Sequence, residues 1–225
     1  MIRRLAKDIL NKLRYLYISK LTIKQKFDYF YQKNVFEGRE SISGEGSSLL
    51  QTKKISKDLL KLFKKLEIKS FVDAPCGDLN WIRHLDFGSI TYLGVDVVQA
   101  LIDKNTKELA SKNRSFVCAD LINYIPPKSD LILCRDCLVH LSFKDALKVL
   151  SNFKKSGSKY ILTTTFPERS SNLDLNSTIW RTLNLEKSPF SFPKPLKILN
   201  ESCTEMNNQY TDKSLGLWKM TDIKI

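Results

Sequence analysis

Helical and strand-like segments alternate along this chain from residue 55 onward. Between the helical stretches stand continuous apolar runs, a pattern typical of a parallel sheet that helices cover on both faces. We therefore expect an α/β protein with a doubly wound, mostly parallel sheet. The predicted elements are helices at 55–66, 97–110 and 142–155, and strands at 70–74, 90–96, 115–119, 130–135 and 159–165.

The end of the chain breaks this alternation. Residues 186–195 are rich in proline, and the segments LKILNE and SLGLWKMTDIKI that follow predict a final pair of strands. We find no internal repeat.

The part before residue 53 has its own pattern. Residues 1–17 predict an amphipathic helix, with apolar residues at three- and four-residue steps opposite basic ones. Such a helix packs on its own domain, covers an active site or lies in a membrane interface, and the pattern leaves these interpretations open. Residues 22–33 predict a second helix, rich in aromatic side chains.

Residues 37–52 carry Gly and Ser without helical or strand periodicity, which indicates a loop. It serves either as a flexible linker or as a lid that contacts an anion. We divide the chain into an N-terminal helical and lid segment, 1–52, and an α/β domain, 53–225.

Length and composition bound the class of protein. A chain of 225 residues with 42% apolar content forms one sizeable core. No run approaches the roughly 18 apolar residues that span a bilayer, and the basic start lacks the features of a signal peptide. Five scattered cysteines suit a reducing compartment. We expect a cytoplasmic protein, held at the inner face of the membrane if residues 1–17 bind lipid.

The formal net charge of +13 indicates either a solvated basic surface or attraction to anions. We favour small anionic substrates or a membrane surface over nucleic acid. The chain has no Arg-rich block, no zinc-finger spacing and no aromatic signature of RNA binding.

Acidic residues stand at the ends of four predicted strands: Asp73, Asp96, Asp120 and Asp136. The stretch SFVDAPCGDLNW (70–81) predicts a strand, a turn and a helix start, and the strand TYLGVDVV follows it. In a nucleotide-type pocket the turn carries the ligand past a helix N-terminus, and the acid after the second strand accepts ribose hydroxyls. Each acid taken alone also fits a helix cap.

The turn has one glycine, Gly77, beside Pro75 and Cys76, and no GxGxxG is present. A pyrophosphate needs close backbone approach at several glycines, so we disfavour one. A ligand without phosphates, such as S-adenosylmethionine (SAM), does not need such close approach of the backbone at several glycines.

The segments DAPCGDLNW, YLGVDVV, CADL and DLILCRDCLVHLS resemble the successive motifs of class I SAM-dependent methyltransferases. More narrowly, ESISGEGSSLLQT, DAPCGDLNW, CRDCLVHLS, YILTTTFP, LNLEKSPFSFPKPL and DKSLGLW together resemble a bacterial subfamily found beside surface-polysaccharide genes. The resemblance covers about residues 37–222. It implies a Rossmann-like seven-stranded sheet whose last strand is antiparallel, with an N-terminal helical lid and SAM as cofactor.

Carried over residue by residue, the resemblance implies the cofactor contacts. Asp73, Gly77 and Asp78 surround the methionine part, Asp96 contacts the ribose, and Asp120 contacts the adenine amine. The family's first motif usually has two further glycines where this chain has Pro75 and Leu79, which makes the turn stiffer. The predicted cofactor-binding set is completed by Ala74, Trp81, Val97, Leu121 and Arg135.

The resemblance also places Arg135 and Asp136 on the methyl-transfer face. Transfer from a sulfonium needs mainly proximity and orientation. A base is needed for a hydroxyl or a protonated amine, but not for a phosphoryl or carboxylate oxygen. Asp136 and His140 are the catalytic candidates, since on one helical turn the carboxylate would orient the imidazole and raise its pKa. A purely structural role of His140 stays open.

Cys134 and Cys137 form a CxxC, but no second pair with zinc spacing exists, so we expect no metal. For the acceptor we expect charge-assisted bonds and stacking from residues after the fifth strand. This predicted acceptor set is Thr165, Phe166, Arg169, Trp180 and Arg181, with Thr163 and Thr164 beside it.

We therefore expect a SAM-dependent enzyme that O-methylates a small anionic acceptor. Candidates are a nucleotide-linked sugar or a phosphorylated or phosphoramidate precursor of a surface polysaccharide. One alternative is nucleic-acid methylation, although the motif of base-amine methylation after the fourth strand is absent. Another is a non-catalytic cofactor-binding partner of a membrane assembly. The oligomeric state does not follow from the sequence.

Overall fold

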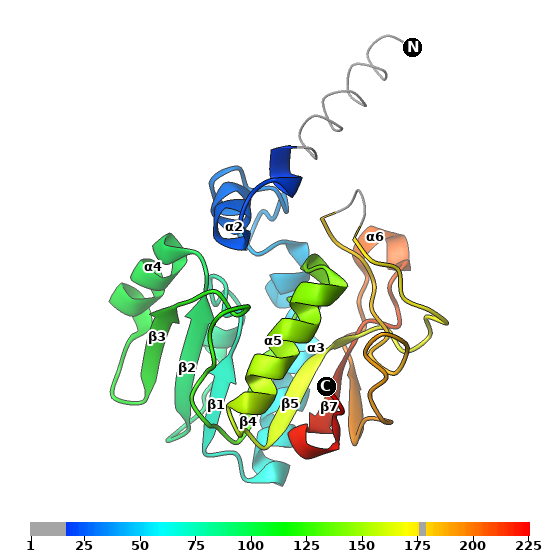
Figure 1. Ribbon diagram of the computed structural model, residues 1–225. Helices are drawn as coiled ribbons and strands as arrows, with labels where there is room; N and C mark the ends of the chain where they lie inside the picture. Colours follow the sequence, from blue (N-terminus) through cyan, green and yellow to red (C-terminus); the bar gives the residue numbers. More distant parts are fainter. Residues whose placement is uncertain (1–16, 176–178) are drawn as a thin grey trace.

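The computed structural model describes residues 17–175 and 179–225, and a seven-stranded sheet forms its centre (Figure 1). The strand order is β3-β2-β1-β4-β5-β7-β6. Strands β1 to β5 run parallel, and β7 lies antiparallel between β5 and β6. The strands are β1 (Ser70–Asp73), β2 (Thr91–Asp96), β3 (Arg114–Cys118), β4 (Leu131–Cys134), β5 (Tyr160–Thr165), β6 (Lys197–Asn200) and β7 (Ser214–Lys219).

This topology confirms the predicted doubly wound sheet with one antiparallel strand. From β1 the chain moves outward to β2 and β3, then returns to β4 on the other side of β1. In open α/β sheets, ligands bind beyond the carboxyl ends of the strands where the order reverses. The fold therefore points to the edge of the sheet above β1 and β4.

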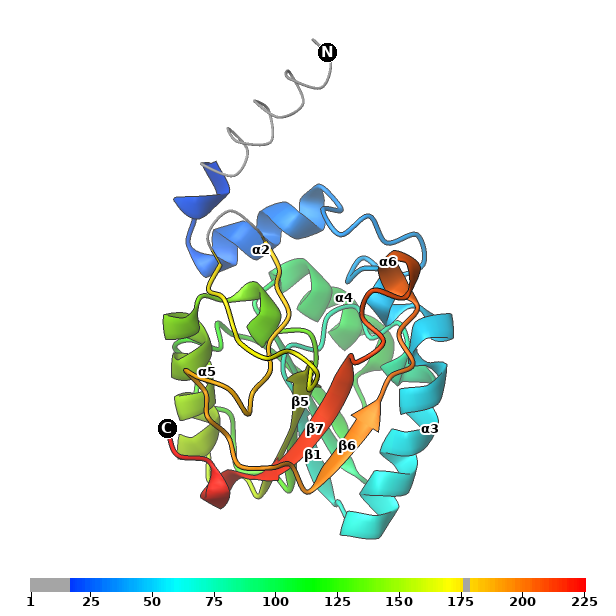
Figure 2. The same ribbon diagram turned by 90° about the vertical axis from the view of Figure 1, so that its right-hand side faces the viewer.

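Helices cover both faces of the sheet, with α3 (Leu49–Leu66) and α5 (Phe143–Lys155) on opposite sides (Figure 2). Helix α4 (Gln99–Leu109) shares the core on the α3 side. Successive strand side chains point to opposite faces. In β1, Phe71 packs with the α3 side and Val72 with the α5 side, so both faces are buried. This explains the continuous apolar runs of the sequence.

The N-terminal lid is represented by α2 (Ile23–Gln32), which lies across the carboxyl ends of the strands (Figure 1). Its first turn is a capping box, in which the Thr22 hydroxyl accepts from the Gln25 amide and the Gln25 side chain accepts from the Thr22 amide. The predicted helix 22–33 is confirmed. Residues 1–16 of the predicted amphipathic helix lie outside the described residues. No described helix is both long and apolar enough to cross a membrane.

One predicted boundary is wrong. Helix α3 begins at Leu49, not at residue 55, so the predicted loop 37–52 is shorter and contains a 3-10 turn, η1 (Glu45–Ser47). Ser48 acts as the N-cap, because its hydroxyl accepts from the Gln51 amide at 3.4 Å. The division of the chain at residue 52 stays a prediction, and α3 runs unbroken across it.

A second prediction is also wrong, because no α-helix starts after the β1 turn. That connection contains only a 3-10 turn, η2 (Ile82–His84). Leu79 takes a left-handed φ of 56° and Asn80 donates its amide to the Asp78 side chain, so the backbone does not enter a helix there. No helix N-terminus faces a ligand at this turn.

The contact between Gly216 and Trp218 in β7 gives a stability prediction. A Cβ at Gly216 would lie 2.2 Å from the buried Trp218 ring. We expect Gly216→Ala to lower the free energy of unfolding by about 1–3 kcal/mol in urea denaturation, because the close-packed ring cannot move freely. In a Trp218→Phe background the smaller ring leaves room, and the same change should cost less. An equal cost in both backgrounds would contradict this steric account.

Candidate functional site

A cavity opens where the fold predicts it, at the carboxyl ends of β1, β2 and β4. The strand ends form its floor, and the apolar face of α2 with the following loop forms its roof. The ten predicted site residues that line it are Asp73, Gly77, Trp81, Asp96, Val97, Asp120, Leu121, Arg135, Asp136 and His140. The fold thus brings together residues from four separate segments of the chain.

Asp96 holds the turn after β1 in place from the neighbouring strand. One carboxylate oxygen accepts from the Gly77 amide at 2.9 Å and the other from the Val98 amide at 3.0 Å. Gly77 has a φ of 57°, and a Cβ there would lie 2.4 Å from the Ser43 hydroxyl. A side chain at this position would be strained, so the turn favours glycine. Burial raises the pKa of Asp96, while the amide hydrogen bonds oppose this shift.

Asp73 lies beneath this turn and is almost fully buried. Burial raises the pKa of Asp73 to about 7, the Tyr92 hydroxyl at 3.0 Å lowers it, and the Asp96 charge raises it further. A carboxyl with a pKa this high ionises at a cost in free energy. A cation beside it would relieve that cost.

Asp120 stands at the opposite wall of the cavity, after β3. It accepts from the Ile122 amide at 2.9 Å and from the Asn123 side chain at 3.2 Å. These bonds orient the carboxylate within its own turn, and Leu121 beside it closes the wall.

Two predicted cofactor residues do not line the cavity. Ala74 is fully buried in the core. The Asp78 carboxylate accepts from the hydroxyls of Ser41 and Ser43 and from the Ile42 amide, at 2.9–3.3 Å. Asp78 thereby fastens the loop before η1 to the β1 turn, and its direct contact with a cofactor stays a prediction.

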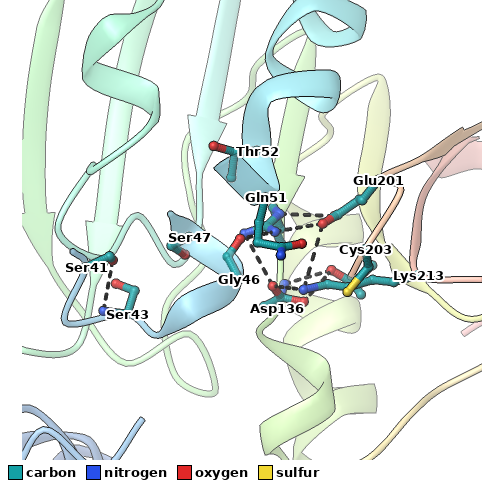
Figure 3. A network of polar contacts seen from close by, with 12 residues as sticks. Ser41, Ser43, Gly46, Ser47, Gln51, Thr52, Asp136, Glu201, Cys203 and Lys213 are labelled. Carbon is teal, nitrogen blue, oxygen red and sulfur yellow. Dashed lines mark hydrogen bonds and ion pairs between the residues drawn. The ribbon is translucent and has the colours of Figure 1, made fainter. Parts of the chain in front are cut away.

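A buried ion network closes the cavity on the β4 side (Figure 3). The Arg135 guanidinium donates to both oxygens of Glu201, at 3.1 and 2.7 Å, and to the Gly46 carbonyl at 2.7 Å. The Lys213 ammonium donates to Asp136 at 2.7 Å and to Glu205 at 3.4 Å. Both cations are nearly inaccessible, so each depends on its carboxylates for compensation.

The network decides the protonation of its members. Burial alone would lower the pKa values of Arg135 and Lys213, but Glu201 and Asp136 raise both above their ordinary values. Burial alone would raise the pKa of Asp136, but Lys213 and Arg135 hold it well below its usual range. Asp136 is therefore an ionised, paired carboxylate.

The predicted pairing of Asp136 with His140 is wrong. These residues do not share an α-helical turn, because Asp136 has a φ of 51° and only a 3-10 turn, η3 (Leu138–His140), follows. The His140 ring donates from Nδ1 to the Ile179 carbonyl at 2.7 Å, which leaves Nε2 as the acceptor. Burial lowers the pKa of His140 to about 4, and this outweighs the Ile179 bond and the Asp136 charge.

None of the five residues predicted for the acceptor lines the cavity. Thr165 and Phe166 are buried, and Trp180 packs on the Phe166 ring. Arg169 pairs with Asp212 at 2.8 Å, and Arg181 donates to the carbonyls of Leu138 and Val139. Their contact with an acceptor stays a prediction, and the packing gives each of them a structural role.

Two parts of the site were not predicted from the sequence: the roof and the partners in the ion network. The roof residues are Ile23, Phe27, Phe30, Tyr31 and Phe36. The aromatic composition of 22–33 was the available signal. Glu201 and Lys213 lie 66 and 77 positions from their partners, and nothing in their local sequence marks them. Among the described residues, no group of three or more His, Cys, Asp or Glu side chains is placed to hold a metal ion.

Comparison with known proteins gives the fold. The chain matches no family model and no curated protein. Among solved structures it is similar to magnesium protoporphyrin IX methyltransferase from Synechocystis PCC 6803 with bound SAM. The TM-score is 0.56 at 16% identity, over 88% of this chain and 97% of that one.

Two further structures are similar. Human N-acetylserotonin methyltransferase, in complex with SAM, gives a TM-score of 0.53 at 12% identity, over 73% of this chain and 51% of that one. The second is N-methyltransferase NodS from Bradyrhizobium japonicum WM9, in complex with S-adenosylhomocysteine (SAH). Its TM-score is 0.51 at 13% identity, over 62% of this chain and 74% of that one.

The chain spans between 47% and 66% of the length of several other structures that it matches. The strand order, the antiparallel β7 and these likenesses agree. The chain has the Rossmann-like fold of class I SAM-dependent methyltransferases.

Proposed function

We propose that this chain is a SAM-dependent methyltransferase that acts on a small molecule. The observation that carries the proposal is the Asp96–Gly77 arrangement at the reversal of strand order. A buried carboxylate ends β2 beside a turn that favours glycine, and both line one cavity. In doubly wound sheets, nucleotide-type ligands bind at this point, with the ribose hydroxyls at the acid after the second strand.

In this assignment each wall of the cavity would bind a different part of SAM. Asp96 would hold the ribose hydroxyls, Asp120 the adenine amine, and Asp73 with the Gly77 turn the methionine part. When bound, SAM supplies an activated methyl group on a positively charged sulfur. The chain's own residues bind and orient the reactants, and the aromatic roof excludes water from them.

For the acceptor we propose a small anionic molecule, such as a nucleotide-linked sugar or a phosphorylated or phosphoramidate precursor of a surface polysaccharide. The net charge of +13 supports an anion, and the resemblance to the bacterial subfamily supports the polysaccharide setting. The same proposal includes two further points: the methylated atom is an oxygen, and the reaction takes place in the cytoplasm.

Titration with SAH tests the cofactor assignment. Asp96→Ala removes the ribose contact and the bond to Gly77, so we expect SAH to bind at least about tenfold more weakly, or 1.4 kcal/mol, in calorimetry. Asp103→Ala is the control, because that residue is exposed on the outer side of α4 and, within the described residues, its carboxylate accepts a hydrogen bond from the Gln99 side chain alone. Wild-type protein that does not bind SAH, or equal affinity in all three proteins, would contradict the proposal.

Asp73 gives a signed prediction for pH and stability. Burial raises its pKa to about 7 from an ordinary value of 3.8, so the native state binds its proton more tightly than the unfolded chain does. Its contribution to the free energy of unfolding therefore falls as pH rises from about 4 to 7. Asp73→Asn should therefore have a higher free energy of unfolding than wild type at pH 8. At pH 5 this difference in free energy of unfolding should be smaller, by on the order of 2 kcal/mol.

The same variant should bind SAH more weakly than wild type at pH 8. The neutral amide keeps the bond from Tyr92 but offers no charge to the cationic amino group of the ligand. Denaturation at both pH values and a parallel SAH titration measure the two effects. A stability difference that does not change with pH would show that Asp73 is already ionised in the native protein at pH 5.

A further inference from the structure

A second cavity lies beside the first and shares two wall residues with it, Ile23 and His140. It is formed between the start of α2, the η3 turn and the start of α5, with Leu175 and Ile179 in its wall. The two cavities thus meet at His140. Its polar lining includes Lys26, His140, Ser142 and Asp145.

Lys26 is the cation of this second cavity. Its ammonium lies 3.4 Å from the His140 carbonyl and 5.6 Å from the centre of the Phe30 ring. No carboxylate in the described part of the chain lies within ion-pair distance of it. Asp145 lines the same cavity, but one of its oxygens accepts from the Ser142 hydroxyl at 2.7 Å in the α5 cap.

Arg181 adds positive potential beside Lys26. It is 8% exposed, and its Nε and Nη2 atoms have no hydrogen-bond partner. Its one ion pair among the described residues is with Asp174, whose oxygen lies 3.8 Å from Nη2. Burial lowers the pKa of Lys26, Asp145 opposes this, and the Arg181 charge lowers it further. An anion placed at Lys26 would reverse both unfavourable effects.

The groups around the meeting point of the cavities are poor bases. The Asp136 carboxylate is held by Lys213 and Arg135 on one oxygen, and the Thr164 hydroxyl lies 3.3 Å from the other. The His140 ring is neutral, fixed by Ile179 and enclosed by the Phe27 and Phe36 rings. A nucleophile that arrives already unprotonated suits this site better than a hydroxyl.

We propose that the second cavity is the acceptor subsite and takes an oxyanion, a carboxylate or phosphoryl group, with Lys26 as its binding residue. This inference rests on the proposed methyltransferase function and narrows its substrate class. Lys26 binds one oxygen, and another oxygen attacks. The electron pair of that oxygen forms the new bond to the methyl carbon, while the carbon–sulfur bond breaks and its pair stays on sulfur. No proton is released, and no base is required.

The test uses full-length protein saturated with SAH and titrated with three probes: phenyl phosphate, benzoate and the neutral phenyl β-glucoside. The phenyl ring suits the aliphatic side chains of the second cavity, among them Ile18, Leu21 and Ile23. Only the first two probes carry an oxyanion. We expect saturable binding of at least one anionic probe and weaker binding of the glucoside. The tighter of the two acids identifies a phosphoryl or a carboxylate acceptor.

Variants of Lys26 assign the contact. Lys26→Gln should weaken anionic-probe binding by about tenfold, the effect of one charge-assisted hydrogen bond, and Lys26→Arg should retain most of it. Lys24→Gln is the matched control, since that lysine lies on the same helix, is exposed and pairs with Asp28. SAH affinity, measured first in every variant, reports intact folding.

The outcomes separate this inference from the proposed function. If wild-type protein does not bind SAH, the methyltransferase assignment itself fails. If SAH binds but no anionic probe does, or if Lys26→Gln binds the probes as tightly as wild type, only the acceptor subsite is overturned. Equal affinity for the glucoside and the two acids would also overturn it.

Discussion

The buried ion network of Arg135, Glu201, Asp136 and Lys213 is the interaction on which the site depends. It joins the end of β4 to the end of β6, the start of β7 and the η1 turn. Two almost fully buried cations are tolerated because carboxylates face them at hydrogen-bond distance. The antiparallel β7 is therefore part of the site, because it brings Lys213 to Asp136.

The acids at the strand ends differ in pairing and in pKa, and the network is the reason. Asp136 is paired, and its pKa stays low. Within the described residues, neither Asp73 nor Asp96 forms an ion pair, and burial raises the pKa of each. Ionisation of either carboxyl therefore costs free energy, and under the proposed function a ligand with hydroxyl and amino groups would relieve this cost. Under that proposal, stability and binding are opposed at these two residues.

Packing explains which sequence predictions were accurate. The strands of the parallel sheet have both faces buried, so each reads as a continuous apolar run, and all five parallel predictions are confirmed within two residues. The start of α3 was misplaced because its first turn depends on the Ser48 cap rather than on apolar periodicity. The helix predicted after β1 is absent because the backbone at Leu79 is left-handed. This conformation is uncommon for leucine, so the sequence does not predict it.

The sequence by itself determined the floor of the site. Parallel strands end at one edge of the sheet, so Asp73, Asp96, Asp120 and Asp136 had to meet once their strands were recognised. The tertiary structure alone decided their charge states and the position of the lid. Lys213 is 77 residues from Asp136, and Ile179 is 39 residues from His140. The pKa of a side chain depends on its burial and on its neighbours in space. The residues next to it in the sequence determine neither of these.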